Sequence, residues 1–66
     1  MTDMTDMQVS HWSFGEGVVI REACTQEDAP LEWQHDWESV VLMEFTVGEG
    51  LYDREWVHRD DLTVIV

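Results

Sequence analysis

Two Gly-Glu-Gly triplets, at 15–17 and 48–50, are the strongest turn signals in this 66-residue chain. The residues after the first triplet, 18–20, are Val-Val-Ile, and branched side chains of this kind favour strands. A glycine pair before such a run indicates a sharp bend, a bulge or a close approach of the backbone to another segment. We therefore predict strands at 8–13 and 17–23, joined at the glycines.

The clearest strand in the sequence is 37–45, WESVVLMEF. Strand side chains alternate between faces, so we assign Val41, Met43 and Phe45 to the core. Val40 and Leu42 then lie on the other face, where either the preceding loop covers them or a partner contacts them.

The C-terminal part of the chain repeats the strand and turn pattern. We predict a hairpin turn at 48–50, a strand at 54–58 with Trp56 and Val57 on opposite faces, a helical turn at 59–61 and a last strand at 62–66. Five short strands in one small domain predict an all-β fold, a five-stranded barrel spanning residues 8–66.

Two segments lack this pattern. Residues 1–7 read MTDMTDM and predict a disordered tail. Residues 25–36 hold the only proline and four acidic residues, so we predict a long acidic loop, in which 29–33 can form one helical turn.

The charge of the chain is strongly negative: 15 acidic residues face three arginines and no lysine, for a formal net charge of −12. Such a protein repels phosphate backbones and anionic lipids, so we expect no direct nucleic acid or membrane contact. Either a basic protein surface is the partner, or the charge only confers solubility or reflects a salt-rich cytoplasm.

No residue pattern indicates catalysis or a metal site. Three histidines, one cysteine and an aspartate do not have the paired spacing of structural zinc ligands: His11, His35, His58, Cys24 and Asp36. His11 instead fits a strand residue whose ring bonds near the glycine bend. We expect no enzyme activity, no cofactor and, since a lone thiol suits a reducing compartment and no leader or membrane span is visible, a cytoplasmic location.

The aromatic residues exceed what a small core needs: Trp12, Trp33, Trp37, Tyr52 and Trp56. One interpretation is an aromatic cage for a methylated cation. The favoured one is that most of them pack in the core or under the loop, while Trp33 of the loop can anchor an interface.

Four motifs together resemble a known family: VSHWSFGEGVV at 9–19, V-x-M-x-F at 41–45, Trp56-Val57, and D-L-x-V-I at 61–65. They are similar to the Tudor-like domain at the C-terminus of UvrD/PcrA-type helicases, over residues 8–66. The resemblance implies an SH3/Tudor-like barrel that binds protein. In those helicases, and in the similar domain of CarD-type transcription regulators, the partner is bacterial RNA polymerase. The 12-residue acidic loop and the acidic turn at 48–52 depart from the family, which weakens the transfer of the partner.

The sequence therefore supports two hypotheses of different classes. The first is an adaptor or regulatory domain for transcription or DNA-repair machinery, with RNA polymerase as the best single partner, binding through Trp33, Val40, Leu42, Glu27, Asp28 and Glu32. The second is an acidic DNA-mimic inhibitor, of a kind that phages encode, which blocks a nucleic-acid enzyme or a CRISPR complex. A third possibility is a small accessory subunit of a larger complex, or a homodimer joined through the face of Val40 and Leu42.

Overall fold

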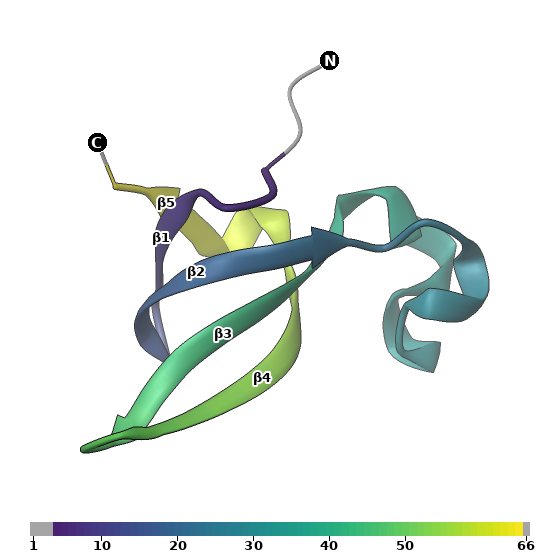
Figure 1. The fold of residues 1–66 in the computed structure, drawn as a ribbon. Coiled ribbons are helices and arrows are strands. Elements are labelled where there is room, and N and C mark those ends of the chain that lie inside the picture. Colours follow the sequence, from purple (N-terminus) through teal and green to yellow (C-terminus); the bar gives the residue numbers. More distant parts are fainter. Residues whose placement is uncertain (1–3, 66) are drawn as a thin grey trace.

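The computed structural model describes residues 4–65 and is mostly β, as the sequence predicted (Figure 1). Three short 3₁₀ helices connect or flank the strands. The elements in chain order are β1 (Gln8–His11), β2 (Gly15–Glu22), η1 (Gln26–Asp28), η2 (Leu31–Ser39), β3 (Val40–Gly48), β4 (Leu51–His58), η3 (Arg59–Asp61) and β5 (Leu62–Val64).

The five strands form one antiparallel sheet in the order β4-β3-β2-β1-β5. The first four strands follow one another as a meander, and β5 returns to pair with β1. Within residues 4–65, β4 and β5 do not pair with each other, so the expected barrel is not closed. The physical reason is that β5 is only three residues long, so beyond its pairing with β1 it offers few backbone groups to a second ladder. The outer edge of β4 is therefore left open.

Strand limits differ from the predicted ones where turns intervene. β1 ends at His11, and β2 begins at Gly15, whose φ of +82° suits glycine. β3 begins at Val40 and not at residue 37, because residues 37–39 belong to η2. The predicted turn at 48–50 and the helical turn at 59–61 are both confirmed.

The main core lies on the inner face of the sheet and confirms the assignment of Val41, Met43 and Phe45. The other buried members are Met4, Val9, Val19 and Val57. β2 crosses β3 closely here. A Cβ added to Gly17 would overlap the carbonyl oxygen of Glu44 and lie 2.7 Å from Met43 Cε, so this position requires glycine.

The prediction of a disordered tail is wrong for residues 4–7, and residues 1–3 lie outside the described part. Met4 is buried in the main core, and its backbone N–H donates to Glu22 Oε2 at 2.9 Å. The N–H of Asp6 donates to the carbonyl of Val19, and the N–H of Val19 donates to the carbonyl of Met7. These hydrogen bonds hold residues 4–7 beside β2. Met4 and Met7 also supply apolar surface that packs on the main core, although the segment as a whole is polar.

A second, smaller core lies between the sheet and the segment that carries η1 and η2. Its buried residues are Ala23, Ala29 and Val40, and three half-buried tryptophans pack against them: Trp33, Trp37 and Trp56. The predicted irregular loop is thus folded into the short 3₁₀ elements η1 and η2, the second of which is broken at Asp36 (φ −132°, ψ 36°), and they lie beside the sheet at the right of Figure 1. The tryptophan rings cover the face of the sheet that carries Val40, which the sequence predicted to be covered either by this segment or by a partner.

Candidate partner-binding site

One end of the molecule is a two-stranded ribbon that projects beyond the core. β3 pairs with β2 only as far as Phe45, opposite Gly17, but its ladder with β4 continues to Gly48, opposite Leu51. Residues 46–52, which we call the ribbon, are therefore held by β3–β4 pairing alone. The ribbon forms the tip at the lower left of Figure 1.

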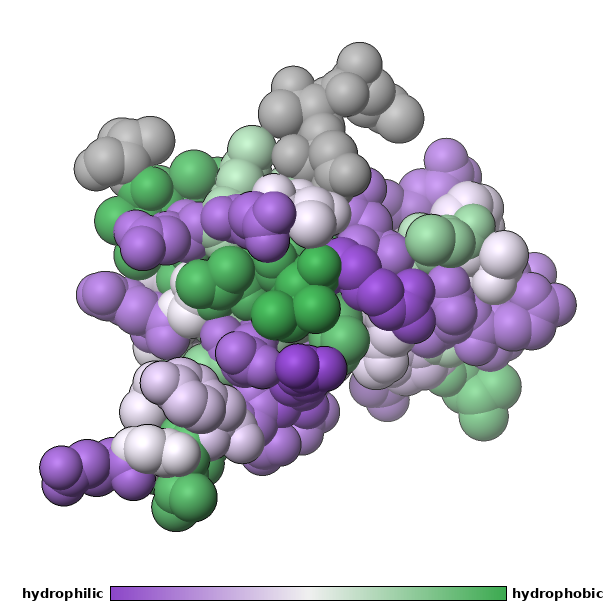
Figure 2. Space-filling model, viewed as in Figure 1, coloured by the Kyte–Doolittle hydropathy of each residue, from purple (hydrophilic) through white to green (hydrophobic). Residues whose placement is uncertain are grey.

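The ribbon exposes large apolar side chains. Val47 is 56% exposed, Leu51 63% and Tyr52 66%, whereas Phe45 just before the ribbon is buried. In Figure 2, hydrophobic and hydrophilic residues meet at this tip, and a second hydrophobic area lies over β2. Side chains this exposed add little to folding, and their grouping at one projecting tip is typical of a contact surface.

The outer edge of β4 is free along this same end. The backbone N–H of Arg54 donates to Asp53 Oδ1 at 2.9 Å, so it points away from β3. In an antiparallel ladder every second residue directs both backbone groups outward, which places those of Tyr52 and Trp56 on the free edge as well. A free edge can accept a further strand, and charges such as Glu55 limit unselective pairing.

The β1–β2 turn lies at the same end and is held rigidly. His11 is buried, and its Nδ1 accepts the backbone N–H groups of Ser13 at 3.0 Å and Phe14 at 3.2 Å, which confirms the role predicted for this ring. Phe14 stacks on Phe45 with ring centroids 4.5 Å apart. Trp12, by contrast, is 79% exposed at the tip of the turn.

All three arginines are paired within the protein. Arg21 Nη1 lies 3.3 Å from Asp28, Arg54 Nε lies 2.9 Å from Glu44, and Arg59 Nη2 lies 2.8 Å from Glu22. Arg21 also lies over the ring of Trp56, 5.0 Å from its centroid. Because each cation already faces a carboxylate, no arginine remains to offset the other acidic groups at the surface.

The residues predicted to form the interface differ in their exposure: one is buried and the others are half-buried or exposed. Val40 is fully buried beneath the tryptophans, so its assignment as a contact residue is wrong; of the two alternatives, coverage by the preceding segment is the one observed. Trp33 and Leu42 are half-buried, with Trp33 edge-on to His58 at 6.2 Å. The predicted acidic members remain at the surface: Glu27 and Glu32 are exposed and Asp28 is half-buried.

Two carboxylates of this region have defined structural partners. Asp28 Oδ2 accepts the backbone N–H of Cys24 at 2.8 Å and faces Arg21, and these bonds lower the pKa of Asp28. Asp36 Oδ2 lies 2.6 Å from His58 Nε2, and this hydrogen bond lowers the pKa of Asp36. The Nδ1 of His58 accepts the N–H of Asp60, so Nε2 carries the proton. Both aspartates therefore hold the η1–η2 segment in place.

The sequence analysis did not assign the exposed apolar residues of the ribbon or the turn to the interface: Trp12, Val47, Leu51 and Tyr52. A local signal existed, since Leu51 and Tyr52 are adjacent large residues directly after the turn glycines. Adjacent strand residues face opposite sides, so both cannot enter one core. The aromatic surplus is likewise resolved in part: Trp33, Trp37 and Trp56 cover the second core, as the favoured interpretation held.

Among residues 4–65, no cluster of three or more His, Cys, Asp and Glu side chains is arranged to hold a metal ion. In the same part of the chain, no helix has the length and apolar character needed to cross a membrane. Comparison with known proteins found no matching family model, no matching curated protein and no matching solved structure.

Proposed function

We propose that this protein is a non-catalytic binding module of the SH3/Tudor-like kind, which docks on a protein with a basic surface. Support for the fold assignment comes from the strand order, in which β5 pairs with β1, and from the single helical turn η3 between β4 and β5. The H-x-x-F-G-E-G-V-V run at 11–19 adds sequence support. Its resemblance to RNA-polymerase-binding domains makes bacterial RNA polymerase the first partner to test.

The observation that carries the proposal is the exposed ribbon with its free β4 edge. A strand of the partner pairs with the outward backbone groups of Tyr52 and Trp56 and with the carbonyl of Arg54, whose N–H is bonded to Asp53, while Leu51 and Tyr52 supply apolar contact. The negative charge of the module steers it toward a basic surface and opposes pairing between two copies of the same acidic chain.

The test is capture of purified bacterial RNA polymerase by the immobilised protein at ~0.15 M and ~0.5 M salt, because exposed charges are strongly screened at the higher value. We expect retention at both concentrations. Tyr52→Lys and Leu51→Lys should each abolish it. Leu31→Lys is the matched control, since Leu31 is 87% exposed on η2, in the segment beside the second core and away from the ribbon.

Equal loss of capture in the Leu31 variant would show that added positive charge, and not the ribbon, decides binding. No capture of RNA polymerase by the unaltered protein would remove that partner. The ribbon proposal would then be tested with other proteins of the transcription and repair machinery, using the same three variants.

A second candidate function is the acidic DNA mimic, favoured by the internal pairing of all three arginines. A mimic occupies the basic groove of a nucleic-acid enzyme mainly through charge, so its binding weakens steeply between the two salt concentrations. It should also be weakened equally by Tyr52→Lys, Leu51→Lys and Leu31→Lys, because each variant adds the same positive charge. The two functions are therefore separated by salt dependence and by the ribbon variants.

A further inference from the structure

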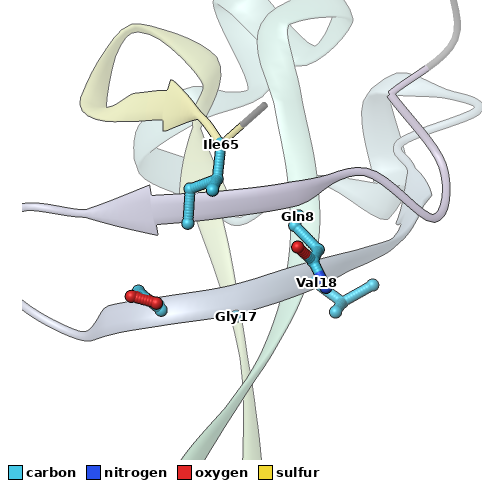
Figure 3. Close-up of a pocket in the computed structure, with 5 residues that line it drawn as sticks. Gln8, Gly17, Val18 and Ile65 are labelled. Carbon is cyan, nitrogen blue, oxygen red and sulfur yellow. The ribbon is translucent and has the colours of Figure 1, made fainter.

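A small hollow lies on the outer side of the sheet where β1, β2 and the end of β5 meet (Figure 3). It has a volume of about 210 Å³ and is lined by Gln8, Glu16, Gly17, Val18 and Ile65. Gln8 and Val18 are directly opposite in the ladder and share this face, whereas Val9 and Val19 face the core. The N–H of Ile65 donates to the carbonyl of Gln8 at 2.9 Å, which fixes Ile65 beside the hollow.

The lining combines apolar walls with one unpaired charge. Val18 is half-buried and Ile65 is 37% exposed, so both present hydrocarbon to the hollow. Gly17 lies between Glu16 and Val18 along β2, and Figure 3 shows it on the strand beside the hollow. None of the ion pairs among residues 4–65 includes Glu16, and the three arginines are held elsewhere.

These features select one class of occupant. An anion is repelled by Glu16 and by the net charge of −12. A purely apolar group would remove water from the Glu16 carboxylate without replacing its hydrogen bonds, which is unfavourable. A long cationic side chain satisfies both parts, because its hydrocarbon stem packs on apolar surface while its head meets the carboxylate.

We propose that the hollow receives an arginine or lysine side chain of the partner. The stem lies along Val18 and Ile65, the cationic head pairs with Glu16, and the amide oxygen of Gln8 accepts a further hydrogen bond. This inference rests on the proposed function, a module for a basic protein, and names the residue type that the partner inserts. It assigns to β1 and β2 a contact separate from the β4 edge.

The test uses the isolated protein and N-acetyl-arginine methylamide as the probe, followed by amide chemical shifts in low-salt buffer. We expect saturable shifts centred on Gln8, Gly17, Val18 and Ile65. The citrulline analogue, which has the same shape without the charge, should leave these shifts unchanged. Glu16→Gln should weaken the binding about fivefold, the effect of about 1 kcal/mol from one exposed ion pair.

The matched control is Glu49→Gln, which removes the same charge at the turn of the ribbon and should leave the affinity unchanged. Shifts that grow without saturating over all acidic residues, or equal affinity in Glu16→Gln, would overturn the proposal. Saturation at another place in the molecule would do the same. Since no partner protein is present, failure here is distinguishable from failure of the ribbon proposal, which appears only in the capture experiment.

Discussion

Glu44 and Arg54 lie directly opposite each other in the β3–β4 ladder, and Arg54 Nε donates to Glu44 Oε2 at 2.9 Å. The pair stands at the base of the ribbon, next to the Phe45–Asp53 pair where the core ends. Both side chains are on the outer face and partly exposed. The pair is therefore placed to align the two strands that carry the ribbon and not to strengthen the core.

We expect Glu44→Gln to lower the free energy of unfolding by less than about 1 kcal/mol, because exposed ion pairs contribute little to global stability. Amide hydrogen exchange in the ribbon should become faster, since local opening there no longer breaks the pair. Urea unfolding and hydrogen exchange measure the two effects, with Glu49→Gln as control. A loss above about 2 kcal/mol would mean that the pair supports the whole fold.

Gly17→Ala should be strongly destabilising. The new methyl group would overlap the carbonyl oxygen of Glu44, which is backbone and cannot rotate away, so β2 and β3 would have to separate. We expect a loss of about 1–3 kcal/mol or more, measured by urea unfolding. Gly48→Ala is the matched control: its nearest neighbour, Leu51 Cδ1, would be 3.6 Å away, in ordinary contact. Equal losses of unfolding free energy in both variants would show that the effect comes from strand propensity and not from the close contact at Gly17.

The sequence predicted those features that depend on residues close together in the chain. Alternation identified Val41, Met43 and Phe45 as core residues and separated Trp56 from Val57. Glycine placed the hairpin turn at 48–50 because Gly50 adopts a φ of +74°. Each of these features depends on neighbours within a few residues.

The features that the sequence did not predict depend on contacts between distant segments. Met4 is buried because Glu22 accepts its N–H and the main core has room beside β2. Val40 is buried because tryptophans of η2 and β4 close over it. The ribbon depends on the strand register, because β3 pairs with β4 beyond Phe45, where its pairing with β2 ends.

The burial of Val40 makes a direct prediction about stability. Val40→Glu would place an unpaired carboxylate among tryptophan rings, and we expect a loss of about 3 kcal/mol or more in urea unfolding. Leu42→Glu should cost about 1 kcal/mol, because Leu42 is only half-buried and the new carboxylate can remain in contact with water. If both variants lost a similar, small amount of unfolding free energy, Val40 would be an exposed residue available for contact.

The bond between Asp36 and His58 predicts how stability changes with pH. The hydrogen bond from His58 holds the pKa of Asp36 below its ordinary value of 3.8, with a smaller contribution from Ser39. A carboxyl group whose pKa is lower in the folded state stabilises the fold above its unfolded pKa, and this stabilisation disappears as the pH falls through the folded value. Acid also relieves the repulsion of a chain of charge −12, so the total stability of the unaltered protein mixes both effects.

The difference in urea midpoint between the unaltered protein and Asp36→Asn measures the contribution of the bond between Asp36 and His58, because the repulsion of the other charges is nearly the same in both. We expect the unaltered protein to have the higher urea midpoint at about pH 5, and the difference to shrink steadily as the pH falls below 3.8 and through the lowered pKa of Asp36. Glu38→Gln, an exposed change in η2 after the break at Asp36, should change the urea midpoint only slightly at any pH in this range. A difference for Asp36→Asn that stays constant across this range would contradict the prediction, because it would mean that the carboxylate charge contributes nothing to the contact with His58.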